Sequence, residues 1–301
     1  SRIFAEETTT LISGLTTKVL RPESVVDFNN DGKEDIFLLG GGSTWGSNRG
    51  SADYLYASNP TTWTPFTLTQ VSNTKMGNRM ATGDFNNDGW IDATTNNIWF
   101  SDLNEVYINS KSVASLSFQV KSLASTGTFS HDVVVGDMDN DSNLDIIIAS
   151  SDGGGDYVYF GDGAGNFADK YRFDGGSRGA VIVCDFDGDG RLDVATGDYY
   201  NSIKIWYTAG ASSYSRTSLF KSSRTISGGT GIYGMACDDV NHDGWPDLVV
   251  SGRLVSVFIN QGYKGESKYI ETDGEQKLFT SNPGWADVHM TLKDMDGDGS
   301  L

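Results

Sequence analysis

The feature that most constrains this chain is an acidic nine-residue motif that recurs along its length. The motif has the form D-x-[DN]-x-D-[GS]-x-x-D, and its sixth copy stops at the eighth position. In chain order, copies one to six are DFNNDGKED (27–35), DFNNDGWID (84–92), DMDNDSNLD (137–145), DFDGDGRLD (185–193), DVNHDGWPD (239–247) and DMDGDGSL (294–301). Their first residues lie 57, 53, 48, 54 and 55 residues apart. Such a regular period predicts an array of similar structural units.

Each copy is flanked by short runs of residues that are typical of β-strands. Around copy three, VVVG (133–136) precedes the motif and IIIA (146–149) follows it, and then come the alternating YVYF (157–160) and the more polar KYRFDG (170–175). Alternation and enrichment in β-branched and aromatic residues over such lengths favour strands over helices. Four strands in about 50 residues, repeated, are typical of a propeller blade. We therefore predict an all-β chain that folds as a β-propeller of four-stranded blades.

The acidic positions of the motif match the ligands of a hard cation. Calcium binds roughly six to eight oxygen atoms, and a loop with carboxylates or amides at positions 1, 3, 5 and 9 and a backbone carbonyl at position 7 supplies most of them. Glycine at position 6 lets the chain turn around the ion. An EF-hand is excluded because copy four has Thr196 instead of glutamate at position 12 and is flanked by strands. We predict about one calcium ion for each complete loop.

The proposed ligands occupy positions 1, 3, 5, 7 and 9, and position 7 contributes only its backbone carbonyl. They are Asp27, Asn29, Asp31, Lys33, Asp35, Asp84, Asn86, Asp88, Trp90, Asp92, Asp137, Asp139, Asp141, Asn143, Asp145, Asp185, Asp187, Asp189, Arg191, Asp193, Asp239, Asn241, Asp243, Trp245, Asp247, Asp294, Asp296, Asp298 and Ser300. They include half of the 40 Asp and Glu residues, which would repel one another at short range without a cation.

The alternative is a set of turns without metal, since Asp, Asn and Gly favour turns on their own. Single sites are also expected to differ in strength. Copies one, two and five have Asn at position 3, which removes one negative charge, and Ser142 replaces the turn glycine of copy three. These four sites are expected to bind calcium more weakly than a loop with the full set.

The overall charge limits the expected partners. The formal net charge is −18 at pH 7, whereas nucleic acids and anionic membranes attract basic surfaces. No apolar run reaches the roughly 18 residues of a membrane-spanning helix. We therefore expect no nucleic-acid partner and no membrane insertion.

The motif between two short strands, together with VYFGDGAGNFAD (158–169), resembles the FG-GAP/VCBS repeat. This repeat builds the propeller of integrin α-subunits, some fungal lectins and many secreted adhesion and carbohydrate-active proteins. The resemblance covers nearly the whole chain and implies a calcium-binding propeller with seven blades when complete. Residues 4–14 precede the first inner strand as an outer strand would, and copy six lacks its last aspartate. We therefore expect residues 1–301 to be a single, incomplete propeller domain, with Asp at position 302.

In propellers of this family the calcium loops lie on one face, and the loops that join blades or second to third strands lie on the opposite face. The candidate ligand-binding residues on that opposite face are Trp45, Arg49, Trp99, Tyr199, Tyr200 and Arg253. Those expected around the mouth of the central channel are Arg79, His131, Arg178, Tyr233, Asp287 and His289. Aromatic rings stack on the aliphatic faces of sugars and polar groups bind their hydroxyls. The alternative is that the aromatic rings pack between blades and the charges are solvated.

The resulting hypothesis is an extracellular or cell-surface binding and adhesion module, with a glycan as ligand and calcium as a structural metal. Calcium loops of this kind fill reliably only outside the cytosol. One alternative is a structural or protein-binding subunit of an extracellular assembly. Another is a polysaccharide lyase or hydrolase that uses a His/Tyr/Arg cluster, although the sequence has no G-x-S-x-G or H-E-x-x-H motif.

The two cysteines lie just before copies four and five, in the expected inner strands of neighbouring blades. Cys184 precedes Asp185 directly, and Cys237 stands two residues before Asp239. Their opposite parity would let the side chains face each other across the blade interface. A disulfide needs Cα atoms within about 7 Å, so the pair is either a disulfide or two buried thiols.

Overall fold

The computed structural model describes most of the motif copies. The described residues are 19–41, 53–57, 67–72, 77–97, 104–113, 116–124, 129–151, 154–175, 178–200, 202–210, 215–227, 231–252, 255–262 and 269–271. The expected outer strand at 4–14, copy six, and the residues Trp45, Arg49, Trp99, Arg253, Asp287 and His289 lie outside them. The predicted blade count and single domain stay predictions.

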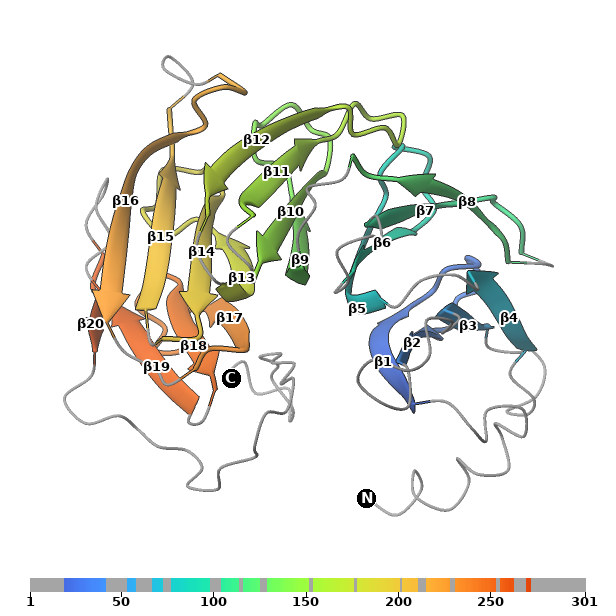
Figure 1. The fold of residues 1–301 in the computed structure, drawn as a ribbon, viewed down its shortest axis with the longest axis horizontal. Helices are drawn as coiled ribbons and strands as arrows, with labels where there is room; N and C mark the ends of the chain where they lie inside the picture. The colour runs from blue at the N-terminus through green and yellow to red at the C-terminus, as the bar shows by residue number, and fades with distance from the viewer. Residues whose placement is uncertain are drawn as a thin grey trace. The chain divides into compact units, whose positions relative to one another are not determined.

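The described residues form β-strands and no helix, arranged as four-stranded sheets of consecutive strands (Figure 1). The first sheet is β1 (Val19–Val26), β2 (Asp35–Gly41), β3 (Asp53–Ala57) and β4 (Thr67–Ser72), and the second is β5 (Gly77–Gly83), β6 (Asp92–Asn97), β7 (Glu105–Asn109) and β8 (Phe118–Ser122). The third is β9 (Ser130–Gly136), β10 (Asp145–Ser150), β11 (Asp156–Phe160) and β12 (Asp169–Asp174). The fourth is β13 (Arg178–Cys184), β14 (Asp193–Asp198), β15 (Ser202–Thr208) and β16 (Phe220–Ser227), and the last is β17 (Gly234–Asp238), β18 (Asp247–Ser251), β19 (Val255–Asn260) and β20 (Tyr269–Glu271).

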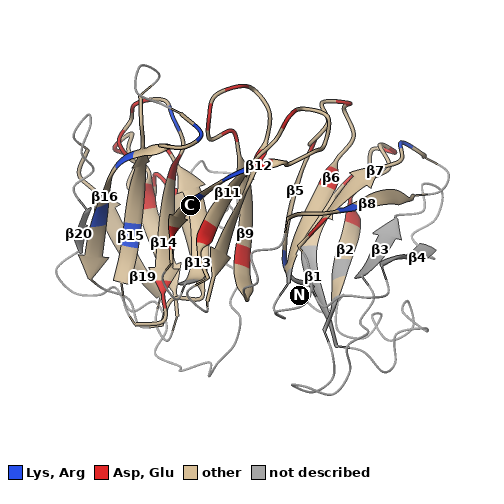
Figure 2. Cartoon of the chain, turned by 45° about the horizontal axis from the view of Figure 1, so that its top comes forward, with Lys and Arg blue, Asp and Glu red and all other residues tan. Residues whose placement is uncertain are grey.

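Each motif copy connects the first and second strand of its sheet, as the sequence predicts for a blade. In the fourth sheet, Cys184 pairs with Asp193 next to copy four, and Arg178 pairs with Asp198 at the other end. Position 9 of the motif is the first residue of the second strand in every described copy. The motif loops of unit 2, defined below, therefore lie at one end of their sheets, where Figure 2 shows acidic residues along the connecting loops.

The chain divides into two compact units. Unit 1 comprises residues 1–130 and 163–166, and unit 2 comprises residues 131–162 and 167–301. In unit 1, Phe28 and Phe37 of the first sheet pack with Tyr107 of the second. In unit 2, neighbouring sheets bury a core that includes Phe186 and Leu248. Burial of such apolar side chains between sheets supplies the main stabilisation of each unit.

The two cysteines form a disulfide between the first strands of neighbouring sheets in unit 2. Cys184 at the end of β13 is bonded to Cys237 in β17, with a Cα–Cα distance of 6.6 Å. The structure thereby decides between the two alternatives left open by the sequence. The bond links the strands that lead into copies four and five.

Candidate metal loops and the aromatic end of unit 2

The loops owe their shape to hydrogen bonds from their own backbone to the aspartate at position 1. In copy four, Asp185 Oδ1 accepts the N–H of Asp189 at 3.0 Å and Oδ2 accepts that of Gly190 at 2.8 Å. The same two bonds form at position 1 of the other four described copies. Position 6 has a left-handed backbone, with φ of +85° at Gly190 and +70° at Ser142. Glycine adopts this conformation without strain, which explains its recurrence there.

The aspartate at position 9 ties the loop to the third strand of its sheet. Asp193 is fully buried, and its Oδ2 accepts the N–H of Phe186 at position 2, while Oδ1 accepts the N–H of Thr208 at the end of β15. Asp92, Asp145 and Asp247 make the equivalent pair of bonds in their own copies. This position is therefore structural in addition to being a proposed metal ligand.

Burial raises the pKa of these position-9 carboxyl groups. The pKa rises to about 6 for Asp92, about 7 for Asp145 and about 8 for Asp193, and it is also raised for Asp247. Backbone hydrogen bonds oppose the rise, and the neighbouring loop aspartates increase it. A cation among these carboxylates would favour their ionised form.

Copies three and four bring three carboxylates together in a form that fits a hard cation. Oxygens of Asp137, Asp139 and Asp145, and likewise of Asp185, Asp187 and Asp193, all lie within 4.8 Å of one another. Among the described residues, Asp139 Oδ1 and Asp187 Oδ1 are buried without a hydrogen-bond partner. Because the donor set consists of oxygen atoms only, it suits a calcium-type ion better than a softer metal.

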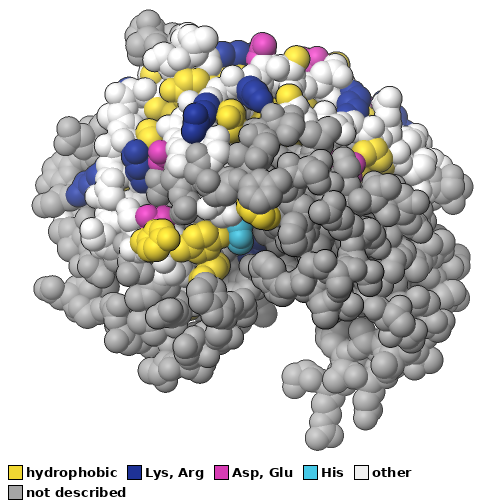
Figure 3. All heavy atoms as spheres, in the orientation of Figure 1, with side chains coloured by type: hydrophobic (Ala, Val, Ile, Leu, Met, Phe, Trp, Pro, Cys, Tyr) yellow, Lys and Arg dark blue, Asp and Glu magenta, His cyan; other side chains and the backbone are white. Residues whose placement is uncertain are grey.

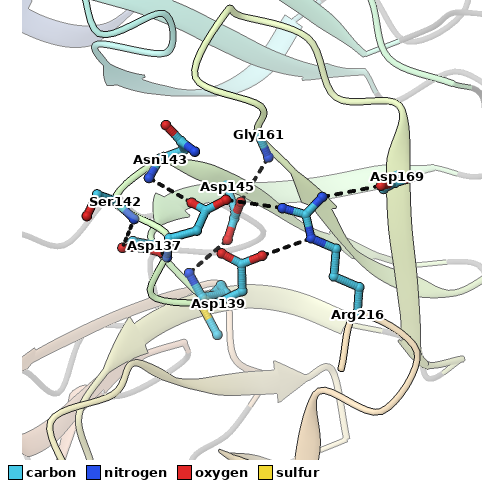
Figure 4. Close-up of polar contacts among 10 residues, drawn as sticks. Asp137, Asp139, Ser142, Asn143, Asp145, Gly161, Asp169 and Arg216 are labelled. Carbon is cyan, nitrogen blue, oxygen red and sulfur yellow. Dashed lines mark hydrogen bonds and ion pairs between the residues drawn. The ribbon is translucent and has the colours of Figure 1, made fainter. Parts of the chain in front are cut away.

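The carboxylate at position 5, which is not part of these three-carboxylate clusters, contacts a basic side chain in three of the described copies. Lys111 Nζ lies 3.0 Å from Asp88 Oδ2, and Lys221 Nζ lies 3.0 Å from Asp189 Oδ2. Arg216 reaches Asp141 in copy three, as well as Asp139 and Asp169 (Figure 4). The sequence motif contains no indication of these partners.

Sequence reasoning also missed the residue that ends the third strand. Asn260 is fully buried, and its Nδ2 donates to the carbonyl of Phe186 in copy four at 3.0 Å and to that of Pro246 in copy five at 3.2 Å. Asn109 makes the same bonds in unit 1, to the carbonyls of Phe28 and Ile91. These asparagines join consecutive motif loops. The repeated ending of VYIN (106–109) and VFIN (257–260) is the signal that could have found them.

The opposite end of unit 2 carries a group of aromatic residues, which we call the aromatic end. It consists of His131, Tyr199 and Tyr233, whose rings contact one another through Tyr199, and of Tyr200, which follows Tyr199 in the chain. The His131 and Tyr199 rings lie 5.4 Å apart edge to face, and the Tyr199 and Tyr233 rings lie 5.3 Å apart. Each of these three residues stands at the strand end that is farthest along its strand from the motif loop. Tyr200 is 79% exposed. Figure 3 shows a patch of hydrophobic-coloured side chains beside a histidine at the surface.

Arg79 and Arg178, which we also expected near the channel mouth, do not belong to the contacting rings. Arg79 is buried in unit 1, where its backbone N–H donates to Asn96. Arg178 begins β13 next to Asp198. The structure therefore brings together His131, Tyr199 and Tyr233 from the sequence-predicted set.

Comparison with known families identifies the repeat. The profile of the FG-GAP-like repeat matches residues 27–94, 137–196 and 185–250, which together cover more than half of the chain. The chain belongs to the FG-GAP-like repeat family. The predicted resemblance is confirmed.

Solved structures support the β-propeller fold. A lectin of Agrocybe aegerita that recognises non-reducing terminal N-acetylglucosamine aligns with a TM-score of 0.53 at 18% identity, covering 85% of this chain and 66% of the lectin. BBS1N in complex with ARL6DN aligns at 0.52 with 10% identity, covering 84% and 70%. The V. cholerae biofilm matrix protein Bap1 aligns at 0.51 with 17% identity, covering 84% of this chain and 40% of Bap1. At these identities the likeness concerns the fold alone.

No curated protein matches the sequence significantly. Within the described part of the chain, no helix is long and apolar enough to cross a membrane.

Proposed function

We propose that this FG-GAP propeller chain is a calcium-stabilised binding module of an extracellular or cell-surface protein, with carbohydrate as its ligand. The observation that carries the proposal is the aromatic end, where rings from three neighbouring sheets meet opposite the motif loops. Tyrosine and histidine present both a ring face, which packs on the C–H face of a sugar, and polar atoms that hydrogen-bond to hydroxyl groups. A net charge of −18 favours a neutral ligand over a polyanion.

Calcium has a structural role in this proposal. The position-1, position-3 and position-9 carboxylates of copies three and four would hold the ion, and the ion would neutralise their mutual repulsion. Equivalent loops in copies one, two, five and six would bind further ions. Calcium would thereby stabilise the angle between the first two strands of each sheet, and with it the arrangement of the side chains at the aromatic end.

Two observations support an extracellular location. The Cys184–Cys237 disulfide belongs to a class of bond that persists in oxidising compartments. Loops of this type also need calcium at micromolar to millimolar concentration, which the cytosol does not maintain.

Proteins with a similar fold bind either a carbohydrate or another protein. One is a lectin that recognises N-acetylglucosamine, one is in complex with another protein, and one is a biofilm matrix protein. A protein ligand on the same aromatic end is therefore the competing outcome.

Binding to a broad panel of immobilised glycans, in calcium and in excess chelator, tests the proposal. We expect saturable, calcium-dependent binding to a narrow class of sugars. The variant Tyr200→Ala should weaken glycan binding about tenfold, because it removes an aromatic side chain from the proposed contact surface. Since the Tyr200 side chain is 79% exposed, the replacement should leave the fold intact. Val113→Ala, at a site that is 59% exposed in unit 1, is the control and should bind normally. A folded protein that binds no glycan contradicts the carbohydrate assignment and points to a protein partner.

A further inference from the structure

The described copies of the motif differ in how the carboxylate at position 5 is held next to position 3. In copies one and five, position 3 is asparagine, and its own amide donates to the position-5 aspartate. The Asn241 Nδ2–Asp243 Oδ2 distance is 2.9 Å, and the Asn29 Nδ2–Asp31 Oδ2 distance is 3.3 Å. In these copies the neutral amide at position 3 supplies a hydrogen-bond donor to the position-5 carboxylate of the same loop.

Copies three and four have aspartate at position 3, which offers no donor. In both, a basic side chain from a distant part of the chain bridges positions 3 and 5. Lys221, in β16, places Nζ 2.6 Å from Asp187 Oδ2 and 3.0 Å from Asp189 Oδ2. The Asp187 carboxylate is fully buried, whereas the Lys221 side chain is 33% exposed.

Arg216 makes the corresponding bridge in copy three. Its Nε lies 2.9 Å from Asp139 Oδ2, and another guanidinium nitrogen lies 3.2 Å from Asp141 Oδ2 (Figure 4). The guanidinium group also lies over the Phe160 ring, 4.8 Å from its centroid, and contacts Asp169. These contacts fix the orientation of a group that is rigid and permanently charged.

The bridged oxygens belong to proposed metal ligands. A calcium ion in these loops would use the position-3 carboxylate of the clustered set and the position-5 carboxylate that the motif predicts as a ligand. Lys221 and Arg216 already engage both carboxylates. The ion and the basic side chain therefore compete for the same negative charge. Both described loops with four aspartates have a cation that bridges positions 3 and 5, whereas in copy two, with three aspartates, Lys111 contacts the position-5 carboxylate of Asp88.

We propose that Lys221 and Arg216 are built-in counter-cations that hold copies four and three in the metal-free protein and weaken calcium binding there. As a result, the two described copies with four aspartates bind calcium less tightly than their charge predicts. The inference rests on the metal loops of the proposed function and not on its glycan ligand.

Calcium titration of the chelator-stripped protein by isothermal calorimetry tests this inference on Lys221→Gln. We expect one class of sites to bind calcium about tenfold more tightly, the order expected for loss of two ion pairs with one buried partner. In chelator, where no calcium is bound, we expect Lys221→Gln to lower the melting temperature, because the loop carboxylates then lose their counter-cation. Lys204→Gln is the matched control, because Lys204 lies on the neighbouring strand β15 and pairs with Asp174, outside the loop.

Asp187→Asn supplies the second arm of the experiment. In this background copy four loses its position-3 carboxylate and Lys221 keeps its pair with Asp189, so the tightening caused by Lys221→Gln should be clearly smaller. The inference is overturned if Lys221→Gln leaves the calcium affinity unchanged, or if the tightening is just as large with Asp187→Asn. If the unaltered protein binds no calcium at all, the metal part of the proposed function fails as well. Loss of glycan binding alone affects neither result.

Discussion

Asn260 joins two motif loops in unit 2, and its removal should destabilise the protein measurably. Its side chain makes three hydrogen bonds, to the carbonyls of Phe186 and Pro246 and from the N–H of Gly262, at 3.0, 3.2 and 3.2 Å. A typical hydrogen bond contributes about 1 kcal/mol net, and a buried carbonyl left without a partner costs more. For Asn260→Ala we therefore expect a loss of about 3 kcal/mol in the free energy of unfolding.

Thermal unfolding followed by circular dichroism, in calcium, measures this loss. At about 2 °C per kcal/mol for a large domain, the melting temperature should fall by roughly 6 °C. Ser256→Ala on the same strand is the control, because its Oγ is buried without a hydrogen-bond partner, and it should change the stability by less than about 0.5 kcal/mol. If Asn260→Ala melts with the control, these hydrogen bonds do not join the loops in the way we describe.

Three further predictions concern the loops and the disulfide. Ser142→Gly should stabilise the protein by about 1 kcal/mol in chemical denaturation, because Ser142 has φ of +70°; a loss of stability would contradict this. In chelator, the free energy of unfolding should fall as the pH rises from about 4 to about 8, because the raised pKa values of Asp145 and Asp193 make the folded state retain protons that the unfolded chain releases. Calcium should reduce this slope, and equal slopes in calcium and chelator would refute the explanation. Replacing Cys184 and Cys237 by serine should lower the free energy of unfolding by about 4 kcal/mol, the loss of chain entropy expected for a 53-residue separation. If the serine variant and the unaltered protein melt at the same temperature under non-reducing conditions, the disulfide does not stabilise the fold.

The repeat period and strand patterns were sufficient to predict the blades. The four-strand unit and the position of each described motif copy between its first two strands follow from local sequence alone, because turn geometry and alternation are local properties. The aspartates at positions 1 and 9 were predicted to be metal ligands, but their hydrogen bonds to the loop backbone were not predicted. Those bonds depend on how the loop closes against the third strand.

The parts that sequence reasoning missed are contacts between distant segments. Arg216 is 77 residues from Asp139 and Lys221 is 34 residues from Asp187. Whether such side chains meet depends on how neighbouring sheets and outer strands pack, which no local pattern encodes. The sequence left the pairing of Cys184 and Cys237 undecided for the same reason, because it depends on the distance between the first strands of two neighbouring sheets.

The measurement that most directly tests the central claim is the melting temperature of the complete protein in chelator and in rising calcium, with magnesium as the control cation. If the aspartate loops hold calcium in the folded state only, the melting temperature rises steadily with calcium concentration. Magnesium should have a much smaller effect, because it requires a tighter octahedral site. The same melting temperature in chelator and in millimolar calcium would contradict the account, since the loops would then be turns that need no metal.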